Sequence, residues 1–109
     1  MSMISVAIKR PGEPPRHVNI SDRLESLQKN VEGFIEIVRI TGTDLVIVCN
    51  EEGLINGMPY NCNICGVDLH GPIIICGERL GPDGGELCDL PCDWQTLKAF
   101  LPDLWRANK

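Results

Sequence analysis

A polar segment held between two apolar runs constrains this chain most. Leu45–Cys49 (LVIVC) and Pro72–Cys76 (PIIIC) are rich in Val and Ile, and runs of this length predict buried strands. The stretch from Cys49 to Gly77 contains carboxylates, asparagines, glycines and a Cys-x-x-Cys pair. Because strands form the scaffold and the segments between them more often carry function, we expect the functional site in this stretch.

The strands of the domain follow from alternation and from apolar runs. Residues 3–9 alternate apolar and polar side chains, as a strand with one buried face does. The Gly-containing connection Thr41–Asp44 separates two β-rich runs and predicts a hairpin. Residues 54–61 and 81–85 contain Gly and Pro and predict loops. Strands are therefore expected near 3–9, 34–40, 45–49 and 72–76, with a short one at 17–20.

A first helix is predicted near residues 22–32. Ser21 or Asp22 can cap it, and with Asp22 as the cap Glu25 falls at the capping-box position. Gly33 suits the left-handed residue that closes a helix. The apolar stripe expected to face the core comprises Leu24, Leu27 and Val31.

A second helix is predicted near residues 93–101, with Asp93 as its cap and Pro102 at its end. Its apolar stripe comprises Trp94, Leu97 and Leu101, and we expect Leu104 and Trp105 to pack back on the sheet. Together these patterns predict a single α+β domain over residues 1–109. Its mostly antiparallel sheet of about four or five strands is expected to be covered on one face by two helices.

Charge and hydropathy narrow the function classes. The net charge is −5, and residues 41–109 hold ten Asp/Glu against four Lys/Arg. An acidic surface repels the phosphate backbone, so we expect no direct nucleic-acid binding. We find no secretory signal, and no apolar run approaches the roughly 20 residues of a transmembrane helix, so we expect no membrane association and a location in the cytosol of a bacterial host.

The six cysteines allow a metal site. Two pairs, Cys62-Asn-Ile-Cys65 and Cys88-Asp-Leu-Pro-Cys92, could bring four thiolates to one structural zinc ion, with His70 as a substitute ligand. In the alternative, these four are partly buried free thiols, and the remaining two are core residues of strands. A redox Cys-x-x-Cys is less favoured, because such a motif normally begins a helix and the residues that follow do not predict one.

A second set of residues predicts a binding rim beside the strands. We expect Gly53 and Gly57 to take backbone conformations closed to other residues, and the two asparagines of the set to satisfy loop amides. Adjacent carboxylates on an extended chain point apart, so this set is a poor general acid/base pair. The residues of the expected binding site are Asn50, Glu51, Glu52, Tyr60 and Asn61.

Several of these residues also carry a resemblance to a family. The strings ESLQK (25–29), GFIE (33–36) and NEEG (50–53), followed by Asn56-Gly57, Pro59 and Asn61, resemble a family from phages, plasmids and gut bacteria known as domain of unknown function 3846. The similarity covers about residues 2–78, and the chain departs from the family pattern where Cys62 follows Asn61. The resemblance implies an α+β fold and an accessory protein of a mobile element, and it implies no activity.

The function these observations favour is that of a small, non-enzymatic accessory binding protein of a phage or mobile element. It would antagonise or regulate a host defence system by binding a protein or a small ligand, and a homodimer is one option for its assembly. A zinc-stabilised structural or interaction module is the alternative. A small enzyme using Glu51 and Glu52, or a Cys–His pair, is a weaker one, because no Ser/His/Asp signature, P-loop or H-E-x-x-H motif occurs.

Overall fold

The first half of the central strand of the domain is a run of buried apolar residues. A computed structural model describes residues 3–82 and 84–106. Strand β7 (Ile73–Gly81) lies between β1 (Met3–Lys9) and β4 (Leu45–Asn50), and both contacts are antiparallel. Because side chains alternate between faces, Ile73 and Ile75 point to one side of the sheet while Ile74 points to the other.

The main sheet has six strands and is antiparallel throughout. Its order is β2-β1-β7-β4-β3, with β2 at Arg16–Ser21 and β3 at Ile35–Arg39, while β8 (Gly84–Cys88) pairs with the second half of β7. A separate hairpin is formed by β5 (Tyr60–Ile64) and β6 (Val67–His70). The helical elements are α1 (Leu24–Val31), α2 (Trp94–Phe100) and the 3-10 helix η1 (Pro102–Trp105). The predicted α+β class and the mostly antiparallel sheet are confirmed.

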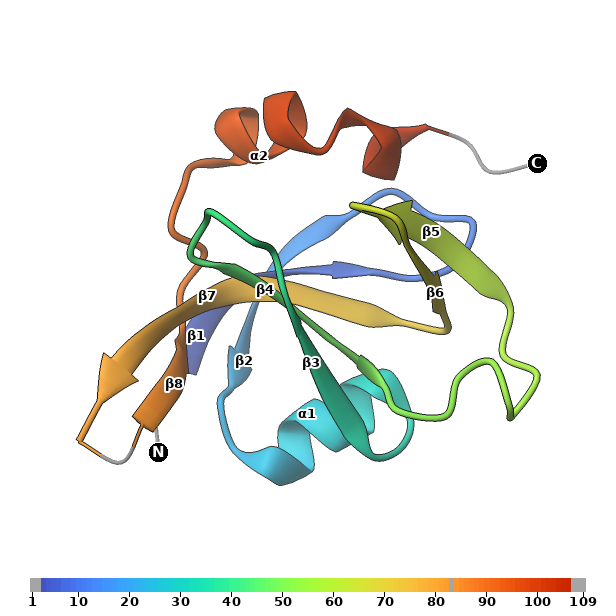
Figure 1. The fold of residues 1–109 in the computed structure, drawn as a ribbon, viewed down its shortest axis with the longest axis horizontal. Coiled ribbons are helices and arrows are strands. Elements are labelled where there is room, and N and C mark those ends of the chain that lie inside the picture. The colour runs from blue at the N-terminus through green and yellow to red at the C-terminus, as the bar shows by residue number, and fades with distance from the viewer. Residues whose placement is uncertain (1–2, 83, 107–109) are drawn as a thin grey trace.

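The two helices belong to different cores, which corrects the expectation that both lie on one face. Leu27 and Val31 of α1 pack in a cluster with Val48 and Ile74, which we call the α1-side core. Leu97 of α2 belongs to a second cluster, the α2-side core. The other members of the α2-side core include Ile47, Ile73, Ile75, Cys62, Ile64, Leu69 and Leu104. Figure 1 shows α1 and α2 on opposite sides of the sheet, with the β5–β6 hairpin on the side of α2.

The ends of α1 differ from the sequence prediction. Arg23 occupies the N-cap without a side-chain cap, because Ser21 Oγ instead accepts the Arg23 N–H at 3.2 Å, so capping by Ser21 or Asp22 was wrong. At the other end Glu32, with φ 64°, takes the left-handed conformation expected of Gly33. Leu24, which the stripe placed in the core, is the first residue of the helix and is 55% exposed, whereas Leu27 and Val31 are buried.

The end of the chain follows its prediction more closely. Asp93 caps α2 by accepting the Thr96 N–H at 2.7 Å, and Pro102 begins η1 rather than continuing the helix. Trp94 and Trp105 meet edge to face, with ring centroids 5.5 Å apart. Among the described residues, no helix is long and apolar enough to cross a membrane.

Three strands were missed. The expected loop at 54–61 ends in β5, the segment after it forms the β5–β6 hairpin, and the expected loop at 81–85 contains the end of β7 and the start of β8. The one residue of that loop between Pro82 and Gly84 lies outside the described residues. The short strands β5 and β8 contain Asn, Cys and Gly, with Ile64 as their one β-branched residue, so their local pattern predicts a strand only weakly. Each is paired with a neighbouring strand, β5 with β6 and β8 with β7.

The position of Leu27 predicts its contribution to stability. Leu27 is 4% exposed in the α1-side core, so Leu27→Ala is expected to lower the free energy of unfolding by about 2–5 kcal/mol. The matched control Leu24→Ala removes the same atoms from an exposed position of the same helix and should change it by under about 0.5 kcal/mol. Urea denaturation of both variants measures the difference, and equal effects would contradict the assignment of the core face.

Candidate binding cleft

The predicted site begins at a buried asparagine at the end of β4. Asn50 Nδ2 donates to the carbonyls of Val31 and Glu32, at 3.1 and 3.2 Å, and its Oδ1 accepts the Glu52 N–H at 2.8 Å. One side chain thus satisfies carbonyls left open at the end of α1 and fixes the turn that follows β4. A Cβ on Gly33 would lie 2.6 Å from Asn50 Nδ2, so the contact also requires that glycine.

The two glycines of the turn have different roles. Gly57 has φ +70°, the left-handed conformation expected of it. Gly53 is not left-handed; it is required because a Cβ there would lie 2.7 Å from the backbone oxygen of His70. The turn therefore packs directly against the end of β6, and its backbone is fixed by the Met58 N–H donating to the Gly53 carbonyl at 2.9 Å.

Asn61 joins the β5–β6 hairpin to the main sheet. It is fully buried, and its Nδ2 donates to the carbonyls of Lys9 and Gly71, both at 2.8 Å. Lys9 ends β1, so this side chain connects two segments far apart in the chain. Asn61 is therefore part of the frame of the site rather than a group presented to a ligand, which agrees with the architectural role expected of the asparagines.

A cleft of about 190 Å³ lies between this frame and the edge of the main sheet. Its walls come from β3, from the end of β4 with the turn that follows, and from β6. Its lining residues are Glu36, Val38, Cys49, Asn50, Glu51, Gly53, Leu54, Val67, Asp68, Leu69 and His70.

The charges that line the cleft have one sign. Glu36, Glu51 and Asp68 are exposed carboxylates from three different elements, and no Lys or Arg occurs among the described lining residues. His70 is held with its Nδ1 3.3 Å from the Met58 carbonyl oxygen, and the ring of Tyr60 meets it edge-on at 5.6 Å. The cleft is therefore suited to a group of positive charge.

The buried thiol at the base of the cleft is a poor nucleophile. Burial, with a smaller contribution from the neighbouring Glu36 carboxylate, raises the pKa of Cys49 to about 11, so the thiol is protonated at neutral pH. Its Sγ lies 3.7 Å from the Glu36 carbonyl oxygen, as a weak donor in the strand pair. The polar side chains that the cleft offers to a ligand thus include carboxylates and an imidazole.

The structure brings together part of the predicted set. Asn50 and Glu51 line the cleft, Tyr60 packs on His70, Glu52 is not a lining residue and Asn61 is buried in the frame. The cleft residues that sequence reasoning missed as ligand-binding residues are Glu36, Asp68 and His70. Glu36 could have been found as the one acidic residue within an apolar strand, whereas Asp68 and His70 reach the site only because β6 folds back along β5.

The cysteines of the predicted zinc set lie in different settings. Cys62 is buried in β5, Cys65 is exposed in the hairpin turn with φ 52°, and Cys88 and Cys92 are half-buried before α2. Burial raises the pKa of Cys62 to about 11, partly offset by the nearby Lys9 ammonium. The described residues contain no group of three or more His, Cys, Asp or Glu that could hold a metal ion, and the zinc site stays a prediction.

A serine and a histidine meet elsewhere in the fold. Ser5 Oγ and His17 Nε2, on neighbouring strands, lie 2.6 Å apart, and Asp89 Oδ1 accepts the backbone N–H of Ser5 at 2.7 Å. The aspartate therefore contacts the serine backbone, whereas the orienting acid of a catalytic triad contacts the imidazole. The His17 ring packs on Trp94 with centroids 5.5 Å apart, so these contacts connect the first two strands to the segment leading into α2.

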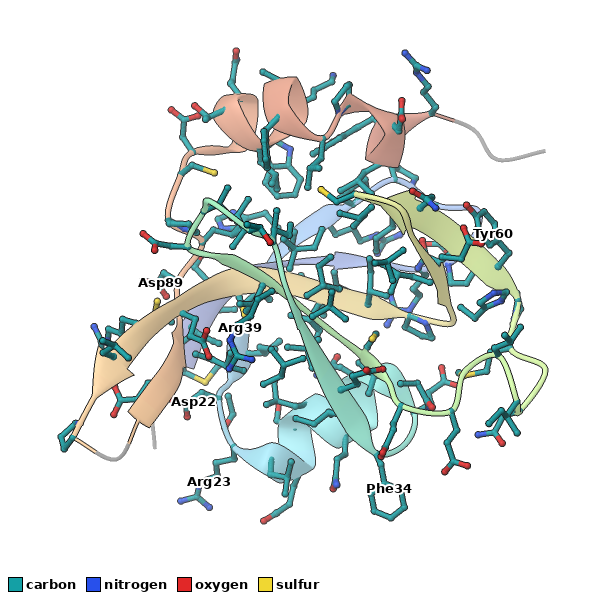
Figure 2. The ribbon with its side chains drawn as sticks, in the orientation of Figure 1. Asp22, Arg23, Phe34, Arg39, Tyr60 and Asp89 are labelled. Atoms are coloured by element: carbon teal, nitrogen blue, oxygen red, sulfur yellow. The ribbon has the colours of Figure 1, made fainter. Side chains whose placement is uncertain are left out.

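A larger hollow of about 600 Å³ lies between the start of β1 and β8, where Figure 2 labels Asp22 and Asp89. Its lining includes Arg79, whose Nε lies 3.5 Å from a carboxylate oxygen of Glu86, so its charges are of both signs. Cys88 is the only predicted site residue among the described residues that line it. The cleft beside β3 is therefore the stronger candidate.

The fold and cleft define a small α+β domain with an acidic cleft at one edge of an antiparallel sheet. The family model described as domain of unknown function (DUF3846) matches residues 3–100, so the chain belongs to this family. The match extends beyond the expected residues 2–78 and includes β8 and α2, so Cys88 and Cys92 lie within the family domain. No curated protein and no solved structure matches the chain in these comparisons.

Close packing at Gly53 predicts a local effect on folding. Gly53→Val places side-chain atoms against the His70 carbonyl and should lower the free energy of unfolding by about 1–3 kcal/mol, because the hairpin must shift. Ile55→Val, at a position of the same turn that is 81% exposed, is the control and should have almost no effect. Thermal denaturation compares the two, and an unchanged Gly53→Val variant would refute the contact between the turn and β6.

The zinc prediction is tested by metal analysis. If Cys62, Cys65, Cys88 and Cys92 bind zinc, the purified protein should contain about one zinc ion per chain, and a chelator should lower its melting temperature. Zinc-free protein with a melting temperature insensitive to chelators would reject the site. If the protein binds zinc, the double variant Cys88→Ser with Cys92→Ser should lose the metal. If it does not, the melting temperature of the double variant should be as insensitive to the chelator as that of the wild type.

Proposed function

We propose that this protein is a small binding protein whose ligand site is the cleft between β3, the turn after β4, and β6. The bound group is a cation, carried by a protein partner or by a small molecule. In this proposal the chain is an accessory protein of a phage or other mobile element, acting in the bacterial cytosol to antagonise or regulate a host defence system. The observation that carries the proposal is that Glu36, Glu51 and Asp68 line one cleft whose described lining residues include no Lys or Arg.

The size of the cleft limits what can enter it. Sites for drug-sized ligands are typically about 300–1,000 Å³, whereas this cleft is about 190 Å³. It suits an ammonium or guanidinium group with part of its aliphatic stem. A whole nucleotide is larger, and its phosphates would meet carboxylates of like charge.

The frame around the cleft favours binding because it is already ordered. Asn50 and Asn61 make four hydrogen bonds to main-chain carbonyls of α1, β1 and the segment before β7. A preformed site loses little conformational entropy when a ligand enters. Asp68 Oδ1 already accepts from Asn63 Nδ2 at 2.8 Å, which holds this carboxylate in place at the cleft.

Exposed apolar side chains beside the cleft favour a protein partner. Leu54 and Val67 line the cleft and are 71% and 39% exposed, and Ile55, next in the turn, is also exposed. Apolar groups that surround a charged site are typical of interaction surfaces. The phage-like resemblance supports a host-directed role, since small accessory proteins of mobile elements commonly act by binding. A zinc-stabilised module and a small enzyme remain the alternatives that the sequence leaves open.

The proposal predicts a specific loss of binding. The double variant Glu36→Gln with Glu51→Gln removes two carboxylates of the cleft and should weaken partner binding at least roughly tenfold. Affinity capture from bacterial lysates, quantified by mass spectrometry, measures which partners the wild type retains and the variant loses. The fold should be unchanged, because exposed carboxylates typically contribute within about 0.5 kcal/mol.

The matched control is Glu25→Gln with Glu52→Gln. It changes the net charge by the same amount, and its residues are exposed on α1 and in the turn without lining the cleft. A partner lost by both double variants would indicate a general effect of charge. If the cleft variant keeps every partner while it remains folded, the cleft is not the binding site.

A further inference from the structure

Strand β3 is an open edge of the main sheet. It pairs with β4 along its whole length, and within the described part of the chain no other strand pairs with its outer side. The Glu51 N–H donates to the Phe34 carbonyl, and the Ile40 N–H donates to the Leu45 carbonyl. In the alternation of an antiparallel ladder, Ile35, Ile37 and Arg39 therefore direct their N–H and C=O groups outward.

This edge lacks several of the features that usually block strand addition. Edge strands commonly carry a lysine, a proline or a bulge that prevents another strand from pairing. Residues 35–39 contain neither Lys nor Pro, and their pairing with β4 is continuous. Phe34, directly before the strand, is 67% exposed, and Figure 2 shows its ring pointing away from the sheet.

The same strand forms one wall of the acidic cleft. Glu36 and Val38 line the cleft, whereas Ile35 and Ile37 pack on the α1-side core. A strand added to the outer side of β3 would alternate in the same way, with every second side chain on the cleft face. The residue opposite Glu36 would form a non-hydrogen-bonded pair, in which side chains approach most closely.

We propose that β3 binds an extended peptide segment of a partner protein as an additional antiparallel strand, and that a Lys or Arg of this segment enters the cleft beside Glu36. This inference rests on the proposed function, and it specifies the ligand of the cleft as a basic peptide segment. Main-chain hydrogen bonds to Ile35, Ile37 and Arg39 supply the pairing, and Glu36, Glu51 and Asp68 select the cationic side chain.

Charge complementarity favours a basic peptide over a second copy of this chain. The only basic residue of β3 is Arg39, and its guanidinium is held by Glu78 through two hydrogen bonds of 2.8 Å. If the β3 strands of two copies of the chain paired with each other, the carboxylates of both clefts would therefore be left without a cation. The opposite edge, β2, lies at the other end of the strand order, away from the cleft, and His17 on it already packs on Trp94.

The test uses a fluorescent peptide of alternating lysine and valine as the probe. In antiparallel addition the lysines lie opposite Glu36, and the valines donate their N–H groups to β3. N-methylation of the valines should therefore weaken binding at least roughly tenfold, whereas N-methylation of the lysines should leave affinity unchanged. Hydrogen exchange should show that the probe protects the amides of Ile35, Ile37 and Arg39.

The outcomes separate this inference from the proposed function. Equal or reversed sensitivity to the two N-methylations, or unprotected β3 amides, would overturn strand addition. If Glu36→Gln with Glu51→Gln still weakens the probe in that case, the cleft binds cations without the strand, and the proposed function stands. The free protein could instead be dimeric, with the β3 amides already protected before the probe is added. That result would assign the edge to a second copy of the chain and overturn the proposal of a partner peptide.

Discussion

The structure depends on burial of both faces of β7. Three consecutive isoleucines supply alternating side chains to the α1-side core and the α2-side core, and Ile75 and Ile74 pair with Ile47 and Val48 of β4. Continuous apolar strands of this kind are more typical of parallel sheets covered on both faces. Here the same burial is achieved in an antiparallel sheet, with α1 on one side and α2 together with the β5–β6 hairpin on the other (Figure 1).

The hairpin that covers the α2 side also creates the cleft. Cys62, Ile64 and Leu69 point into the α2-side core, so Asp68, next to Leu69 on its strand, lies on the opposite face of the hairpin. Asn61 and the backbone contact at Gly53 then hold the hairpin against the end of the main sheet. All four residues of β6 line the candidate cleft, and Leu69 among them also belongs to the α2-side core.

The sequence predicted those elements whose pattern is local. Strands 3–9 and 45–49 were predicted within one residue, because a strand with a buried face or an apolar run has a distinct pattern. The side on which each helix packs was not predictable, since the stripe of Leu27 and Val31 indicates that one face is buried and not which layer covers it. Glu51 was found because it belongs to a recognisable turn, whereas Asp68 and His70 join it only through the return of β6, which no local pattern encodes.

The position of β7 in the sheet has a consequence for how the chain folds during its synthesis. β1 and β4 are not neighbours in the sheet. β1 pairs with β2 and β4 pairs with β3, and β7 lies between β1 and β4 and connects the two pairs. Residues 73–77 must therefore have left the ribosome before the β1–β2 and β3–β4 pairs can be joined in one sheet. Contacts of such long sequence separation form slowly and expose apolar surface meanwhile. The main sheet can therefore form as one cooperative unit only after β7 has been synthesised.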